Sequence, residues 1–245
     1  MAVLALSAFQ DNYIWIIKNK TDFICVDPGD AMPVLTFAKQ AKLALSAILL
    51  THHHADHIGG VNELKKFFPE AVVYDLFETM DKPESIELGQ YKFDILQTPG
   101  HTETHVCYFE QKKHWLFCGD TLFSAGCGRV FDGTIENLYN SLQQLKQLPD
   151  NTRVYCAHEY TRQNLQFALT VEPDNHTAQI YLNMLEANPH EISLPSTIGF
   201  EKKINPFLRL DKPAVQAFVQ QHTPNAQTQE ACFEYLRHAK DKFKA

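Results

Sequence analysis

The feature that most constrains this chain is a dense group of histidine and aspartate side chains directly after a short apolar run. Residues 51–60 read Thr-His-His-His-Ala-Asp-His-Ile-Gly-Gly and follow the run Ala-Ile-Leu-Leu. Alternate side chains of an extended segment lie on the same side, so we expect His52, His54 and Asp56 to converge. His57 then points another way and is free to serve a second metal ion. The loop therefore predicts two adjacent metal sites.

The composition is that of an acidic globular protein. Hydrophobic residues make up 44% and charged residues 21% of the 245 residues, and the net charge is −7. This charge argues against a general nucleic-acid binder, although it leaves a local basic patch open. We expect no secretory leader, and the sequence has no apolar run long enough to span a membrane. We expect a cytoplasmic monomer that is not attached to membranes.

The six cysteines are spread along the chain without a Cys-x-x-Cys spacing, which argues against a thiolate zinc site. We expect reduced, mostly buried thiols. Cys127 lies in a Gly-Cys-Gly segment, but no neighbouring pattern supplies an activating base, so we interpret it as structural.

Periodicity predicts an α/β protein whose character changes towards the C-terminus. Period-two and continuous apolar runs predict strands over residues 3–6, 13–18, 23–26, 47–50, 71–74, 93–97, 106–109, 115–118 and 153–157. Helical spacing predicts helices over residues 33–42, 61–68 and 136–147, and later over 177–187, 214–221 and 227–240. We expect a layered αββα domain over residues 1–167 and a small helical domain over residues 168–245.

Three further candidate ligands follow predicted strands in turn-like contexts. His101 comes after Thr-Pro-Gly, Asp120 after Phe-Cys-Gly and His158 after Tyr-Cys-Ala. Taken singly, each is more typical of an ordinary strand end or turn. Together with the loop they give five histidines and two aspartates, a set that suits zinc, iron or manganese without choosing among them. Such a set fits two ions about 3.5–4 Å apart with one bridging carboxylate.

These residues resemble the metallo-β-lactamase superfamily and, more narrowly, the glyoxalase II (hydroxyacylglutathione hydrolase) family. The resemblance runs nearly end to end. It is carried by Asp11-Asn12-Tyr13, Thr51 to Gly60, Thr98-Pro99-Gly100-His101-Thr102, Cys118-Gly119-Asp120-Thr121, Gly126-Cys127-Gly128-Arg129, His158-Glu159-Tyr160, Asn205-Pro206-Phe207-Leu208-Arg209 and Arg237-His238-Ala239-Lys240-Asp241.

The resemblance implies a metallo-β-lactamase-like αββα sandwich with a small helical C-terminal domain. It implies two divalent ions per chain, zinc first and iron or manganese as alternatives. It assigns His52, His54 and His101 to one ion, Asp56, His57 and His158 to the other, and Asp120 to both. The implied substrate is a small-molecule glutathione thioester, chiefly S-D-lactoylglutathione, contacted by Arg129, Phe131, Tyr160, Arg237 and Lys240.

Two positions depart from the family pattern. The family often has lysine at Arg129, a replacement that keeps the charge, and tyrosine at Phe131. Because Phe131 lacks a hydroxyl, we expect one hydrogen bond to glutathione to be missing, at a cost on the order of 1 kcal/mol. For Arg237 and Lys240, three positions apart on a predicted helix, a solvated face is the alternative interpretation.

The implied reaction is thioester hydrolysis, in the service of methylglyoxal detoxification, by a hydroxide held between the two ions. A metal ion would stabilise the oxyanion. Asp56 and Asp120 would thus act in catalysis as well as in metal binding, Asp56 by orienting the nucleophile.

Three rival interpretations stay open. A persulfide dioxygenase would use one iron, and the helical tail with Arg237 and Lys240 argues against it. A phosphodiesterase or RNA-processing nuclease is disfavoured by the negative charge. A non-catalytic metal-binding protein is disfavoured by the complete ligand set.

Overall fold

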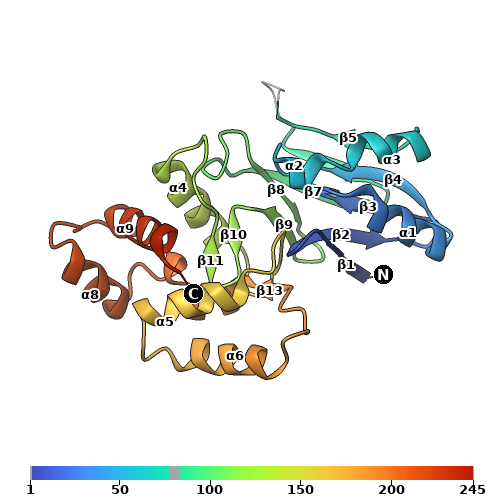
Figure 1. Ribbon diagram of the computed structural model, residues 1–245. Coiled ribbons are helices and arrows are strands. Elements are labelled where there is room, and N and C mark those ends of the chain that lie inside the picture. The colour runs from blue at the N-terminus through green and yellow to red at the C-terminus, as the bar shows by residue number, and fades with distance from the viewer. Residues whose placement is uncertain (1, 78–82, 245) are drawn as a thin grey trace.

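The computed structural model describes residues 2–77 and 83–244, and its central feature is a pair of mixed sheets (Figure 1). The first sheet has the strand order β1-β2-β3-β4-β5. Neighbouring strands from β1 to β3 are antiparallel, whereas those from β3 to β5 are parallel. The strands are β1 (Ala2–Ala8), β2 (Asn12–Lys18), β3 (Asp22–Val26), β4 (Ala44–Leu49) and β5 (Val72–Tyr74).

The second sheet has the strand order β13-β12-β9-β8-β7-β6, and all its neighbouring strands are antiparallel except the parallel pair β12 and β9. A short ribbon of β10 (Leu122–Phe123) and β11 (Gly126–Cys127) stands beside it. The strands are β6 (Ser85–Leu88), β7 (Tyr91–Gln97), β8 (Val106–Glu110), β9 (Trp115–Gly119), β12 (Arg153–Cys156) and β13 (Ser196–Thr197).

The sheets pack together because each strand of the first sheet is apolar on both faces. Neighbouring residues Ile16 and Ile17 of β2 belong to different core clusters, as alternation along a strand requires. Ile17 packs in the cluster that contains Phe93 and Phe117 of the second sheet. Ile16 packs in the cluster that includes α1 (Ala31–Ala41) and α3 (Val61–Phe67). The result is a layer of helices, two sheets and further helices.

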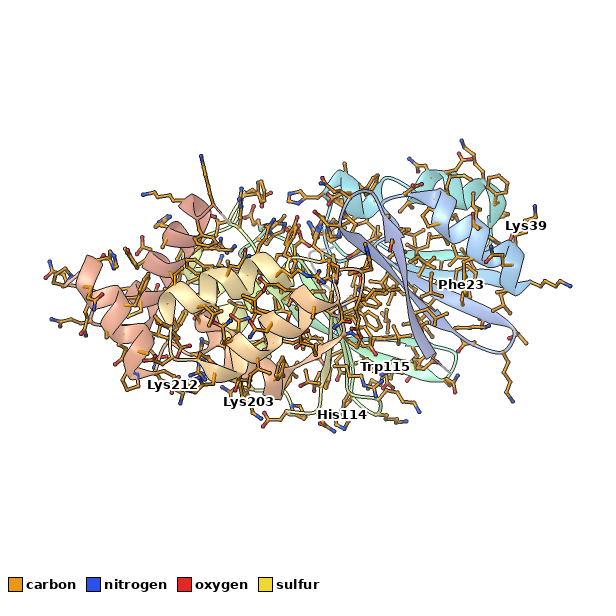
Figure 2. The ribbon with its side chains drawn as sticks, turned by 60° about the horizontal axis from the view of Figure 1, so that its bottom comes forward. Phe23, Lys39, His114, Trp115, Lys203 and Lys212 are labelled. Atoms are coloured by element: carbon orange, nitrogen blue, oxygen red, sulfur yellow. The ribbon has the colours of Figure 1, made fainter. Side chains whose placement is uncertain are left out.

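On the other side of the sheets lie α4 (Ile135–Lys146) and the C-terminal helices, drawn from yellow to red in Figure 1. The C-terminal helices are α5 (Thr161–Val171), α6 (His176–Ala187), α7 (Ile198–Ile204), the 3-10 turn η1 (Pro206–Leu208), α8 (Pro213–His222) and α9 (Gln229–Lys242). Figure 2 shows the lysines Lys39, Lys203 and Lys212 at the rim of the molecule and Phe23 inside it. Within the described ranges, no helix is both long and apolar enough to cross a bilayer.

The predicted elements all occur, with ends that coincide or differ by at most three residues. The elements that were not predicted are α2 (Ala55–Ile58), α5, α7, η1, β6, β13 and the ribbon of β10 and β11. The boundary predicted at residue 167 falls within α5, and the division into two domains stays a prediction.

Candidate metal centre

The His-x-His-x-Asp-His loop lies where strands of both sheets end. In the second sheet β7, β9 and β12 run in the same direction, because β8 is antiparallel to both β7 and β9, and β12 is parallel to β9. Their carboxyl ends therefore meet at one edge, and His101, Asp120 and His158 follow these ends. The Val106 N–H donates to the Thr51 carbonyl at 2.9 Å, which holds the loop after β4 against this edge.

Gly119 lets the end of β9 approach that loop closely. Its φ is +47°, in the left-handed region, and a Cβ here would lie 2.3 Å from Thr51 Oγ1 and 2.8 Å from His105 Nε2. Any larger residue would displace Asp120 from the loop, so the glycine before this aspartate is part of the site's construction.

The first group of candidate ligands consists of His52, His54, His101 and Asp120, with one donor atom from each within 4.8 Å of the others. His54 Nδ1 lies 3.0 Å from His52 Nε2 and 3.1 Å from His101 Nε2. Asp120 Oδ2 lies 3.5 Å from His101 Nε2. Four donors from three loops thus face one point.

The second group consists of Asp56, His57 and His158. Asp56 Oδ2 lies 3.6 Å from His57 Nε2 and 3.5 Å from His158 Nε2. The other oxygen of Asp120, Oδ1, lies 3.5 Å from His57 Nε2 and 3.4 Å from His158 Nε2. Asp120 therefore offers one oxygen to each group, the arrangement a bridging carboxylate needs.

The prediction that Asp56 converges with His52 and His54 is wrong. The segment is extended only as far as His54, because α2 begins at Ala55 and turns the backbone. Asp56 consequently faces His57 and not the pair formed by His52 and His54.

Two buried polar atoms show that the residues fit metal ions. His57 Nε2 and Asp120 Oδ1 are buried and have no hydrogen-bond partner within the described part of the chain. Leaving such atoms unpaired costs about 1–3 kcal/mol each. A cation between them would satisfy both, and imidazole with carboxylate is the donor set that zinc, iron and manganese accept.

Burial and nearby charges favour the deprotonated, metal-binding form of some ligands and oppose it for others. Burial raises the pKa of Asp120, but His57 and His158 outweigh it and hold this pKa well below its usual range. Burial keeps the pKa of His52 well below its usual value, so His52 is neutral. Burial likewise lowers the pKa of His158, but Asp120 and Asp11 outweigh it and raise it to about 9. A metal ion must therefore displace a proton from His158 at neutral pH.

An oxygen atom lies close to the second ring nitrogen of His101 and of His57. His101 Nδ1 lies 2.8 Å from the Arg129 carbonyl, and His57 Nδ1 lies 3.1 Å from Asp27 Oδ2. Asp27 is buried and also accepts hydrogen bonds from the Thr51 N–H and hydroxyl, at 2.8 and 2.7 Å. Asp27 was not predicted as a site residue, although the Asp-Pro-Gly turn after β3 marks its position.

The residues predicted to contact substrate line one cavity of about 430 Å³ beside the ligands. These residues are Arg129, Phe131, Tyr160, Arg237 and Lys240. Tyr160 stacks on the ring of His158, with centroids 4.7 Å apart. Arg237 is buried, and its guanidinium donates to the carbonyls of Cys127 and Gly128 at 2.8 and 3.2 Å. It therefore adds charge to the cavity while Nη1 and Nη2 donate to protein groups.

Comparison with known proteins agrees with this geometry. A model of the metallo-β-lactamase superfamily matches residues 9–94 and 78–158, and a model described as the hydroxyacylglutathione hydrolase C-terminus matches residues 159–243. The hydroxyacylglutathione hydrolase of Legionella pneumophila (strain Corby) is 49% identical over 254 residues, which cover 100% of both chains. The chain belongs to the hydroxyacylglutathione hydrolase family. The predicted family relationship is thereby confirmed.

Solved structures place this hydroxyacylglutathione hydrolase family member in a known fold. The BLEG-1 B3 metallo-β-lactamase matches with a TM-score of 0.64 and 25% identity, over 85% of this chain and 99% of that one. The di-iron-bound form of TTHA1623 matches with a TM-score of 0.60 and 25% identity, over 85% and 100% of the two chains. The predicted metallo-β-lactamase-like fold with a helical C-terminal region is confirmed.

Proposed function

We propose that the chain hydrolyses S-(2-hydroxyacyl)glutathione thioesters, S-D-lactoylglutathione foremost, to glutathione and D-lactate, and so removes methylglyoxal. The observation that carries this proposal is that two ligand groups joined by Asp120 adjoin a cavity also lined by Arg129 and Lys240. The names of the related proteins support the substrate class.

The cofactors we propose are two divalent ions, zinc first and iron or manganese as alternatives. The di-iron form of a structural relative supports iron among the alternatives. Bound by these ligands, two ions supply hydroxide near neutral pH and stabilise negative charge on the thioester oxygen.

The chain's own residues bind and orient the substrate. Arg129, Arg237 and Lys240 give the cavity a positive field, which suits the anionic glutathione moiety in a chain whose net charge is −7. Asp56 is partly exposed at the cavity and is placed to orient a water molecule. The leaving thiol has an ordinary pKa of about 8.5, so it departs as thiolate without a general acid.

The first test is hydrolysis of S-D-lactoylglutathione by the purified protein, followed at the thioester absorbance before and after chelation. We expect turnover that the chelator abolishes and that zinc, iron or manganese restores. No turnover by protein that holds about two ions would reject the thioesterase and redirect the search to persulfides and phosphodiesters.

A variant tests the bridging residue. Asp120→Ala removes an oxygen from each ligand group, so we expect it to lose bound metal and turnover together. Normal metal content and normal turnover in this variant would contradict the proposed site.

We also propose that the protein works in the cytoplasm as a monomer, without nucleic-acid partners. The six buried, unpaired cysteines, typical of a reducing compartment, support the cytoplasmic placement, and the negative charge supports the absence of nucleic-acid partners.

A further inference from the structure

The turn between β1 and β2 lies against the second group of ligands, although the turn and these ligands are far apart in the sequence. Asp11 Oδ1 lies 2.8 Å from His158 Nδ1. Asn12 Nδ2 donates to Asp56 Oδ2 at 2.9 Å. Asn12 is buried, with 7% of its surface exposed, although it is the first residue of β2 and directly follows the hairpin turn.

Backbone hydrogen bonds fix this turn in place. The Tyr13 N–H donates to the Ala157 carbonyl at 2.7 Å, and the Glu159 N–H donates to the Asp11 carbonyl at 2.9 Å. These bonds involve Ala157 and Glu159, the residues directly before and after His158, so they fix the turn beside this histidine. A hairpin of the first sheet is thus joined to the ligand that follows β12 of the second sheet.

We propose that Asp11 and Asn12 are positioning residues for the second metal ion, Asp11 through His158 and Asn12 through Asp56. This inference rests on the proposed assignment of metal ligands, and it gives a role to the N-terminal turn, which is outside the ligand pattern.

The chemistry of the two contacts supports these roles. A carboxylate accepts the Nδ1 proton of His158, and this fixes the tautomer that leaves Nε2 with a free lone pair. Nε2 is the atom that faces Asp56 and Asp120, at 3.5 and 3.4 Å. Asn12 donates to the Asp56 oxygen that faces both histidines of the group. A carboxylate oxygen has lone pairs for both the amide and an ion.

We expect the turn to strengthen binding of the second ion more than binding of the first. The first group is held differently, since the Arg129 carbonyl faces His101 Nδ1 and the Thr51 hydroxyl lies 3.1 Å from His52 Nδ1. The side-chain hydrogen bonds of Asp11 and Asn12 described above lead only to His158 and Asp56. Loss of either side chain should therefore weaken one ion selectively.

The test is chelator competition on the metal-loaded full chain, with zinc as the probe. In Asp11→Ala and in Asn12→Ala, we expect the affinity for one zinc ion to fall about 10–100-fold while the other keeps its wild-type value. Asp11→Asn keeps an oxygen acceptor but loses the charge, so its affinity should lie between those of wild type and Asp11→Ala.

A matched control uses the other end of the same strand. Asn19 donates to Asp22 Oδ1 at 2.8 Å in the turn after β2, and neither residue belongs to the groups of candidate ligands. Asn19→Ala should change neither zinc affinity. The melting temperature of each metal-free variant, measured in parallel, should equal that of the metal-free wild type.

The outcomes separate this inference from the proposed function. The positioning role would be overturned by equal losses of zinc affinity at both ions together with a lower melting temperature of the metal-free variants. It would also be overturned by unchanged zinc affinities at both ions. A wild-type protein that binds no zinc, iron or manganese would overturn the metal centre itself, and the positioning role with it.

Discussion

Lys240 is a lysine whose surroundings disfavour its charged form. Burial, together with the nearby cations Arg237 and Arg129, lowers its pKa to about 8. The ring centroids of Phe167 and Phe243 lie 5.6 and 5.2 Å from Nζ. The charge that we propose to attract glutathione therefore titrates just above neutral pH.

This titration predicts a pH-dependent KM for the glutathione thioester. Because the pKa of Lys240 is lowered to about 8, the cation is present below that pH and is lost above it. We expect KM to rise above this pH in steady-state assays from about pH 6.5 to pH 9.5, with little change in kcat. Lys240→Arg stays charged throughout and should abolish the rise. An equal rise in this variant would show that another group is responsible.

Phe131 is an exposed aromatic residue beside the first group of ligands, with 64% of its surface accessible. The centroid of its ring lies 5.0 Å from that of His54 and 5.2 Å from that of His101. Phe131→Tyr keeps these ring contacts and adds a hydroxyl towards the cavity. We expect a KM about fivefold lower, from a hydrogen bond worth about 1 kcal/mol, with unchanged metal content. A KM equal to that of wild type would mean that the hydroxyl finds no partner on the substrate.

At the residue scale, the sequence predicted some parts of the site and not others. The pattern of histidines and aspartates identified side chains that the fold does bring together. The residues that orient them were not identified, because those contacts join distant positions. Asp11 and His158 are 147 positions apart, and Asp27 and Thr51 are 24 apart. Only the folded topology makes them neighbours.

At the scale of elements, the position of helix α9 depends on Arg237. Its guanidinium donates to the carbonyls of Cys127, the last residue of β11, and of Gly128, and also to Asp241 at 3.0 Å. A planar fork makes these contacts simultaneously, and an ammonium group does not.

Arg237→Lys should therefore displace α9 and, with it, Lys240. We expect KM to rise about tenfold or more, from charged hydrogen bonds worth about 1.5–3 kcal/mol, while metal content stays unchanged. Lys242→Ala, at an exposed position of the same helix, is the control and should behave like wild type. A loss of metal in Arg237→Lys would instead tie α9 to the metal centre.

Element prediction succeeded where apolar periodicity was strong, as in α4, whose Leu138, Leu142 and Leu145 are buried. It failed for α5, which begins at Thr161 with four polar residues and has no side-chain cap. It also failed for α2 and the ribbon of β10 and β11, because elements of two to four residues are too short to show a period.

At the scale of the whole molecule, Glu201 of α7 joins the helical region to the sheets. It is fully buried and accepts hydrogen bonds from the Ser124 hydroxyl at 2.9 Å and the Ala125 N–H at 2.7 Å, and also from Ser196 and Asn205. The main core cluster likewise contains side chains from both regions, such as Phe117 and Phe233.

We therefore expect one cooperative unfolding transition, and a lower melting temperature in Glu201→Gln. The amide keeps the shape of the side chain but presents N–H groups to several donors, at a cost of about 1–3 kcal/mol. That corresponds to a fall of roughly 2–10 °C in a chain of this size. Calorimetry of both proteins measures it, and two separate transitions in wild type would mean that the regions unfold independently.

The buried cysteines have a consequence for chemical durability. Burial raises the pKa of every one of the six thiols, to about 12 for Cys107 and about 11 for Cys127, which lines the cavity. Thiol–disulfide exchange requires a thiolate, and at neutral pH these groups supply almost none. A protein that we propose to release glutathione at every turnover would thus be shielded from exchange with the disulfide form of that product, oxidised glutathione, which would otherwise yield a mixed disulfide and one reduced glutathione.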